Sequence, residues 1–253
     1  MIFYADLGNT TATLGVLDGM EIKGFWRIMT SERTPEEYGV IIRSLLERTS
    51  LKAMPDRAGI CSVVPSETDR LASAVAAVLG VEVAKIDGEG DWGISVNTDN
   101  PSEVGGDRVA NAVGAYYQYG GPCIVVDAGT ATTYDYVSAD GEYCGGVIAP
   151  GIRCGARDLW RGTRMLPAVE IRKPDKVIGT NTVDCMQSGI FYGSVSQVEG
   201  VVRRMWAELG MECPVILTGG QAEMFHEDLV FDSVYDPHLT LKGIACAVDP
   251  SLR

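Results

Sequence analysis

Two short stretches, Asp6–Thr13 (DLGNTTAT) and Asp127–Tyr134 (DAGTATTY), decide the fold of this chain. Each follows an apolar stretch, Ile2–Ala5 or Cys123–Val126, of the kind that forms a buried strand. A second strand-like stretch comes after each loop and ends at an Asp-Gly pair, whose glycine suits the positive φ of a tight turn. The same strand, loop, strand, turn and strand therefore occur twice, which predicts two related halves.

The rest of the sequence alternates between helix and strand patterns. Thr34 is expected to cap a helix that runs to about Glu47, with Pro35 in its first position and Glu37 completing a capping box. Further strands are predicted at 59–64, 81–86 and 215–217, and helices at 66–79, 102–119, 182–209 and 239–248. The glycines at 189 and 193 leave open an interruption of the long helix. We therefore expect an α/β protein whose halves meet between residues 119 and 122 and face each other across a cleft that holds both Asp loops.

The composition excludes several classes of protein. Lys and Arg number 21 and Asp and Glu 34, so the formal net charge is 21 − 34 = −13, which disfavours a broad nucleic-acid surface but not one bound nucleotide. No apolar run is long enough for a transmembrane helix, and the N-terminus has no signal-peptide pattern. The seven cysteines contain no Cys-x-x-Cys pair, which favours free thiols in a reducing cytoplasm.

The Asp loops have the residue types that bind polyphosphates. Their glycines let the backbone turn closely and expose N–H groups, and Asn and Thr side chains add hydrogen bonds. A carboxylate at a strand end can hold Mg²⁺ directly or through water, so two loops could grip a polyphosphate for phosphoryl transfer. One Asp-x-Gly by itself is often only a tight turn, and the repeat supports a shared fold more strongly than shared chemistry.

Three further segments are candidates for substrate binding. In Gly105-Gly106-Asp107-Arg108, Asp107 can accept the proton of an attacking hydroxyl, and Arg108 can pair with a carboxylate or phosphate. The alternative is an ordinary helix start with a favourable first-turn Asp. Thr182 could bind a polar group or simply cap the helix that follows it. Thr218-Gly219-Gly220 could admit a base or ribose, or form a plain turn.

Together these segments resemble one known family, the type III pantothenate kinases, within the superfamily of acetate and sugar kinases, Hsp70 and actin. The matching stretches occur in family order and span most of the chain. They are 6–10, 100–108, 126–133, 145–151, 181–189 and 217–220. The resemblance implies two ribonuclease H-like halves, residues 1–120 and 121–253, flanking a cleft.

The resemblance also implies an activity, the ATP-dependent phosphorylation of pantothenate to 4'-phosphopantothenate, the first step of coenzyme A biosynthesis. Asp107 would be the general base. The residues implied to bind ATP are Asp6, Leu7, Gly8, Asn9, Thr10, Thr11, Ala12, Thr13 and Thr130. Those implied to bind pantothenate are Gly105, Gly106, Asp107, Arg108 and Thr182. Asp6 would hold Mg²⁺, and Asp127 would bind a monovalent cation, K⁺ or NH₄⁺. The family is homodimeric and cytoplasmic, which implies no nucleic-acid or membrane partner.

The sequence departs from the family pattern at three positions. Gly106 stands where alanine is common, which suggests a freer loop, Ala128 stands where phenylalanine is common, and Thr98 where tyrosine is expected. These departures concern the packing of the substrate pocket. The alternatives are a superfamily kinase for another hydroxyl substrate, such as a sugar, and an ATP-binding regulatory protein.

Overall fold

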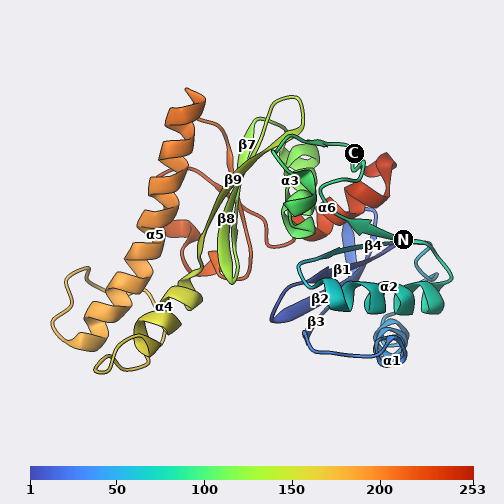
Figure 1. The fold of residues 1–253 in the computed structure, drawn as a ribbon, viewed down its shortest axis with the longest axis horizontal. Coiled ribbons are helices and arrows are strands. Elements are labelled where there is room, and N and C mark those ends of the chain that lie inside the picture. The colour runs from blue at the N-terminus through green and yellow to red at the C-terminus, as the bar shows by residue number, and fades with distance from the viewer. The chain divides into compact units, whose positions relative to one another are not determined.

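The computed structural model describes residues 1–253 and divides into two compact units, each with its own sheet (Figure 1). The first unit contains residues 1–120, 141–143 and 238–253. The second contains residues 121–140 and 144–237. The end of the chain therefore packs with its beginning.

The first unit is built on a five-stranded sheet in the order β3-β2-β1-β4-β5. Its strands are β1 (Ile2–Leu7), β2 (Thr11–Asp18), β3 (Glu21–Met29), β4 (Arg57–Ser62) and β5 (Val83–Ile86). Its helices are α1 (Pro35–Glu47), α2 (Pro65–Leu79), α3 (Gly106–Tyr119) and α6 (Leu239–Val248), with short 3-10 turns at Pro101–Glu103 and Pro250–Leu252. The expected capping box at the start of α1 is confirmed, because Glu37 N–H donates to Thr34 Oγ1 and Thr34 N–H to Glu37 Oε2.

Side chains along β1 alternate between the two faces of the sheet, so that one face forms the core of the first unit and the other carries Asp6. Phe3, Ala5 and Leu7 are buried in one cluster with residues of α1 and α2, including Tyr38 and Leu71. Side chains of the opposite parity point to the other face of the sheet. Helices α3 and α6 cover that face, as Figure 1 shows. Asp6 therefore lies on the face where α3 begins.

The second unit repeats this arrangement. Its sheet has the order β11-β10-β7-β8-β9-β6, so β9-β8-β7-β10-β11 matches β3-β2-β1-β4-β5 of the first unit strand for strand. The strands are β7 (Cys123–Ala128), β8 (Ala131–Val137), β9 (Glu142–Pro150), β10 (Val215–Thr218) and β11 (Val234–Tyr235). The sixth strand, β6 (Ser95–Val96), belongs to the first unit, as do Glu142 and Tyr143 at the start of β9, with which it pairs. Its helices are α4 (Ile152–Arg161) and α5 (Thr182–Leu209), with 3-10 turns at Ala222–Met224 and His226–Asp228. The repeat predicted from the two Asp loops is confirmed.

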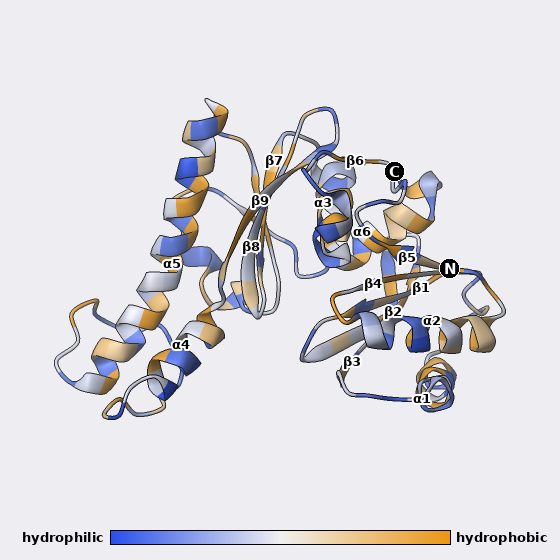
Figure 2. Cartoon of the chain, viewed as in Figure 1, coloured by the Kyte–Doolittle hydropathy of each residue, from blue (hydrophilic) through white to orange (hydrophobic).

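The core of the second unit lies between its sheet and α5. Ile124, Val126 and Ala128 of β7 are buried with Phe191 and Val198 of α5. The helix alternates between hydrophobic and hydrophilic residues along its length, as expected for a helix with one face on a sheet (Figure 2). By the same alternation as in β1, Asp127 points away from this core.

Three local features differ from the sequence-based expectations. Helix α5 runs without interruption through Gly189 and Gly193, because it is packed on both sides of them: Met186 lies in a cluster with Ile152 of α4, and Val195 packs on the sheet. Helix α4 was not predicted. The second Asp loop is one residue shorter than the first, since Asp6 pairs with Thr13 but Asp127 pairs with Thr133.

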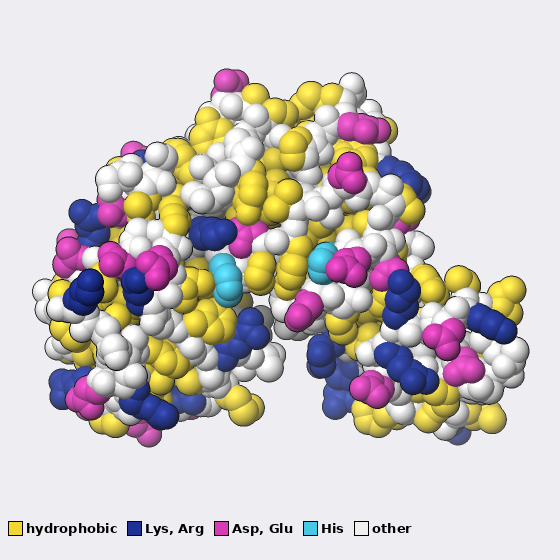
Figure 3. All heavy atoms as spheres, turned by 180° about the vertical axis from the view of Figure 1, so that it is seen from behind, with side chains coloured by type: hydrophobic (Ala, Val, Ile, Leu, Met, Phe, Trp, Pro, Cys, Tyr) yellow, Lys and Arg dark blue, Asp and Glu magenta, His cyan; other side chains and the backbone are white.

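The surface agrees with an acidic protein that has no extended basic area on the face that Figure 3 draws. Lys and Arg side chains there are interspersed with Asp and Glu. None of the helices is both long enough and apolar enough to cross a membrane.

Candidate active site

The first Asp loop is a turn between β1 and β2, tied down by its own backbone. Gly8 N–H donates to the Thr11 carbonyl at 3.1 Å, and Thr30 holds the loop from β3's end through Thr30 Oγ1 to Gly8 O (2.7 Å) and Thr30 N–H to Thr10 O (3.0 Å). Asn9, Thr10 and Thr11 are exposed at the tip. The loop therefore presents polar groups from a rigid hairpin.

Two members of the predicted ATP loop face inward. Leu7 and Ala12 are both buried in the core of the first unit, where they pack with α1 and α2. Their side chains cannot reach a ligand in this conformation. Any contact that they make with ATP is restricted to their backbone groups.

Asp6 lies beside a buried cysteine of the neighbouring strand. Strands β1 and β4 are parallel, and their register pairs Asp6 with Cys61. The Cys61 thiol is fully buried and donates to Asp6 Oδ1 across 3.4 Å. This pairing joins two residues that are 55 positions apart in the sequence.

Asp107 stands in the first turn of α3, directly above these strands. Gly105 caps the helix without a side chain, and Arg108 N–H donates to Asp107 Oδ1 at 2.8 Å. A Cβ added at position 106 would overlap the Ile86 carbonyl oxygen and lie 3.3 Å from the Cβ of Cys61. Gly106 is therefore needed for the close approach of α3 to β4 and β5, rather than for the freer loop that the sequence suggested.

Electrostatics link Asp6, Cys61 and Asp107. Burial raises the pKa of Asp107 above its ordinary value, and the N–H and positive charge of Arg108 oppose the rise in part. Burial also raises the pKa of the Cys61 thiol, and the charges of Asp6 and Asp107 raise it further. The first unit thus brings two predicted site carboxylates together around one buried, protonated thiol.

Arg108 is held beside the start of α3 by an aromatic ring. Its guanidinium carbon lies 5.7 Å from the ring centroid of Tyr143, within the range of a cation–π interaction. The side chain is half-buried. Arg108 is therefore oriented while it keeps access to solvent, as a group that binds an anionic ligand requires.

The second Asp loop lies in the second unit, at the ends of β7 and β10. Asp127 pairs with Thr133 on one side and with Thr218 on the other. A Cβ at Gly219 would overlap Asp127 Oδ1, and a Cβ at Gly129 would lie 3.7 Å from it. Gly219 also has φ +87°, which disfavours any other residue. Two glycines thus form a narrow cradle around the Asp127 carboxylate.

Thr130 is exposed at the tip of this loop, and its carbonyl accepts a hydrogen bond from Gly151 N–H at 3.1 Å. Of the three departures from the family pattern, Ala128 lies in the core of the second unit, and Thr98 Oγ1 is buried without a hydrogen-bond partner.

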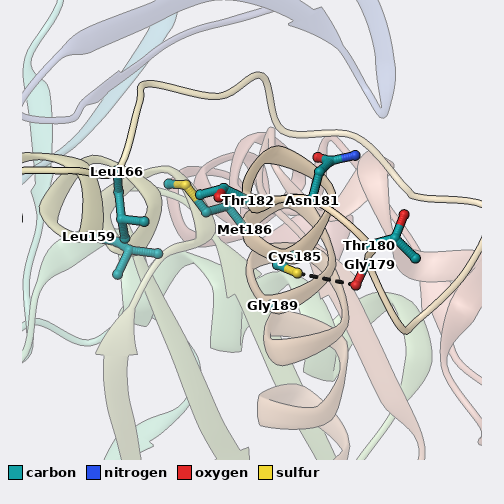
Figure 4. Close-up of a pocket in the computed structure, with 9 residues that line it drawn as sticks. All are labelled: Leu159, Leu166, Gly179, Thr180, Asn181, Thr182, Cys185, Met186 and Gly189. Carbon is teal, nitrogen blue, oxygen red and sulfur yellow. Dashed lines mark hydrogen bonds between the residues drawn. The ribbon is translucent and has the colours of Figure 1, made fainter.

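Thr182 lies in another part of the second unit, at the start of α5. It is the first residue of the helix and not its cap, because Asn181 Oδ1 accepts the Asp184 N–H at 3.0 Å. Thr182 lines a cavity of about 450 Å³ whose other lining residues are Leu159, Leu166, Gly179, Thr180, Asn181, Cys185, Met186 and Gly189. In Figure 4, Leu159 and Leu166 lie at one end of this cavity and Thr180 at the other.

The cavity therefore has an apolar end and a polar end. The polar end is held in shape by the segment before α5, where the Cys185 thiol donates to Gly179 O at 3.4 Å (Figure 4) and Ser188 Oγ donates to Val177 O at 2.5 Å.

The chain offers no cluster of three or more His, Cys, Asp or Glu side chains that could cage a metal ion. A magnesium ion that arrives with a nucleotide does not need one, because Mg²⁺ in kinase sites is held by one or two carboxylates together with substrate phosphates. Asp6, next to the exposed tip of the first loop, fits this requirement.

Among Asp6, Cys61 and Asp107, Cys61 is the one residue that reasoning from the sequence missed. The signal was present only indirectly, as a cysteine in the predicted strand at 59–64. Its place beside Asp6 depends on the register of two parallel strands, which the sequence does not show.

Comparison with known proteins identifies the family that this sequence matches. The sequence profile of the type III pantothenate kinase family matches residues 2–204. A type III pantothenate kinase of Agathobacter rectalis is 42% identical over 248 residues, which cover 96% of this chain and 95% of the relative.

Solved structures share the fold at much lower identity. A protein from Campylobacter jejuni described as a Baf family transcriptional activator has a TM-score of 0.61 at 19% identity, with 97% of this chain and 96% of that chain covered. The ROK hexokinase of Thermus thermophilus has a TM-score of 0.57 at 12% identity, with 100% and 99% covered. The predicted fold class is thereby confirmed. From the family profile and the Agathobacter rectalis relative, we conclude that this chain belongs to the type III pantothenate kinase family.

Proposed function

We propose that this member of the family transfers the γ-phosphoryl group of ATP to pantothenate with Asp107 as the general base. Family membership supplies the reaction, the first step of coenzyme A biosynthesis. The observation that carries the role of Asp107 is its position: a desolvated carboxylate in the first turn of α3, beside Asp6 and Cys61. A raised pKa makes a carboxylate a stronger proton acceptor, which suits general-base catalysis.

In this mechanism the terminal hydroxyl oxygen of pantothenate attacks the γ-phosphorus as its proton passes to Asp107. The new O–P bond forms while the bond from the γ-phosphorus to the bridging oxygen of ADP breaks. Catalysis of such transfers rests mainly on positioning and charge neutralisation. The first-turn location also places the helix N-terminus of α3 near the developing negative charge, which it stabilises.

For ATP, we propose that the first loop binds the phosphates through its backbone N–H groups and the side chains of Asn9, Thr10 and Thr11, with Thr130 contributing from the second loop. The exposure of these four residues supports the role. Asp6 would hold the Mg²⁺ that accompanies ATP. The magnesium ion supplies charge neutralisation at the phosphates.

For the monovalent cation, we propose Asp127. Its carboxylate sits in a cradle of two glycines, where backbone and carboxylate oxygens can approach an ion closely. A weakly hydrated K⁺ or NH₄⁺ there would offset phosphate charge without the dehydration cost of a second Mg²⁺.

For pantothenate, we propose that Gly105, Gly106, Asp107 and Arg108 bind the substrate, with Thr182 as a further contact. Gly105 lies against the Asp107 carboxylate, since a Cβ there would be 2.6 Å from Asp107 Oδ1, so a side chain at this position would crowd the base. Arg108 is a suitable partner for the carboxylate of pantothenate.

We also propose a homodimer that works in the cytoplasm without a nucleic-acid or membrane partner. A group of exposed apolar side chains on α4 and around the start of α5 supports self-association. Its members are Trp160, Met165, Val177, Ile178 and Val183, which are 41%, 92%, 63%, 83% and 41% exposed. All seven cysteines are free thiols, as suits a reducing compartment.

The decisive experiment measures ADP release with ATP, Mg²⁺, K⁺ and pantothenate. We expect turnover with all four components, stimulation by K⁺, and none with a sugar in place of pantothenate. Asp107→Asn keeps the shape but removes the base, and should lower kcat by about 10²–10⁴-fold. Asp69→Asn is the matched control, because Asp69 is an exposed acid of α2 whose one ion pair, with Lys85, lies at the surface. Full turnover by Asp107→Asn would remove Asp107 from the mechanism.

A further inference from the structure

The carboxylate of Asp6 is not held by its own loop but by the strand beside it. Strands β1 and β4 run parallel, and the Cys61 thiol donates to Asp6 Oδ1 across 3.4 Å. Cys61 has no solvent exposure, so this hydrogen bond does not compete with water. A buried donor of this kind restricts the rotation of the carboxylate that it meets.

Cys61 also lies beneath the start of α3. A Cβ added at Gly106 would lie 3.3 Å from the Cβ of Cys61, so there is little room for a side chain between α3 and Cys61. The thiol therefore stands between Asp6 on β1 and the segment that carries Asp107, and it feels the charge of both. Two carboxylates around one neutral donor repel each other less than two carboxylates with an apolar group between them.

We infer that Cys61 is a positioning residue that orients the Asp6 carboxylate toward Mg·ATP and keeps it in register with Asp107. This inference rests on the roles proposed above for Asp6 and Asp107. Because Cys61 has no solvent exposure, it acts in this role only through Asp6 and not by touching a substrate.

The test compares three replacements of Cys61. Cys61→Val removes the donor and fills the site with a slightly larger apolar side chain, while Cys61→Ser keeps a donor, and a hydroxyl is a stronger donor than a thiol. For Cys61→Val we expect kcat/KM for Mg·ATP to fall about tenfold, which corresponds to ~1.4 kcal/mol, with little change in KM for pantothenate. Cys61→Ser should recover most of that loss. Cys61→Ala extends the series should the valine variant fail to fold.

Cys123→Ala is the control for simple packing. Cys123 is equally buried, at the start of β7 in the second unit, and burial rather than a neighbouring carboxylate raises the pKa of its thiol. Cys123→Ala should lose about as much thermal stability as Cys61→Ala but keep wild-type kinetics.

Two results would overturn the inference. One is wild-type Mg·ATP kinetics in folded Cys61→Val or Cys61→Ala. The other is a serine variant as impaired as the valine variant, which would make the role steric. Either result leaves the proposed role of Asp107 as the base intact. Full turnover by Asp107→Asn would instead contradict that role, and the Cys61 variants would still test the orientation of Asp6.

Discussion

At the scale of a single residue, two opposed effects act on the ionisation of Asp107. Burial disfavours its charged form, while the Arg108 N–H and the first turn of α3 favour it. Burial has the larger effect, so the ionised carboxylate lowers the stability of the folded protein. Groups placed in this way are concentrated at functional sites, where a shifted pKa serves the chemistry.

A pH dependence follows from the raised pKa of Asp107. The base works as a carboxylate, so turnover should fall as the pH drops through a pKa above the ordinary 3.8. Folding stability changes with pH in the opposite direction. Above the raised pKa the ionised Asp107 destabilises the folded protein, and this cost disappears once the pH is below 3.8. Asp107→Asn should therefore melt no lower than wild type at pH 7 although its turnover is strongly reduced. A clearly lower Tm than that of Asp69→Asn would contradict this.

Gly106 gives a prediction about packing. A Cβ at this position would overlap the Ile86 carbonyl oxygen, so Gly106→Ala should push the start of α3 away from β5 and cost about 1–3 kcal/mol of unfolding free energy. We also expect reduced turnover, because Asp107 follows directly. Gly155→Ala, in open space on α4, should instead gain about 0.5–1 kcal/mol. Urea titration of both variants measures the difference, and equal stability of the two would show that the close approach is absent.

At the scale of elements, the start of α5 depends on Asn181. Its side chain accepts the Asp184 N–H and donates to Asp184 Oδ2 at 2.7 Å. Asn181→Ala removes the cap and should cost ~1 kcal/mol, whereas Asn181→Ser keeps an accepting oxygen and should cost less.

The same substitution tests the proposed role of Thr182, the first residue of the helix. A frayed first turn should raise KM for pantothenate and leave KM for ATP unchanged in Asn181→Ala. Steady-state kinetics with each substrate varied in turn provides the measurement. A change in KM for ATP alone would place Thr182 outside the pantothenate site.

At the scale of the whole molecule, the two units repeat one sheet order, and the chain returns to the first unit through α6. Gly59 and Gly243 permit this return, because a Cβ at Gly59 would meet Ile244 and Val248, and one at Gly243 would overlap the Ala110 carbonyl of α3. The first unit is therefore completed only when the last residues of the chain have folded onto it.

The oligomeric state is the prediction that belongs to this scale. Two copies of the 27.1 kDa chain give 2 × 27.1 = 54.2 kDa, which light scattering should report for the wild type. Ile178→Glu places a charge in the exposed apolar group and should shift the mass toward 27.1 kDa. Met29→Glu is the control, because Met29 is 74% exposed on β3 of the first unit. A monomeric wild type, or dissociation of the control, would count against this surface.

The sequence by itself determined the features that arise from neighbouring residues. The two strand–loop–strand units, the capping box at Thr34 and the positive φ of Gly19 and Gly141 all follow from local chemistry, and the structure confirms them. The tertiary structure alone decided that Cys61 meets Asp6 and that Gly106 must be small. Both depend on strand register and on the seating of a helix, which are set by contacts between residues far apart in the chain. Such contacts leave no periodic trace in the sequence, so the cysteine between the two aspartates could be recognised only in the folded molecule.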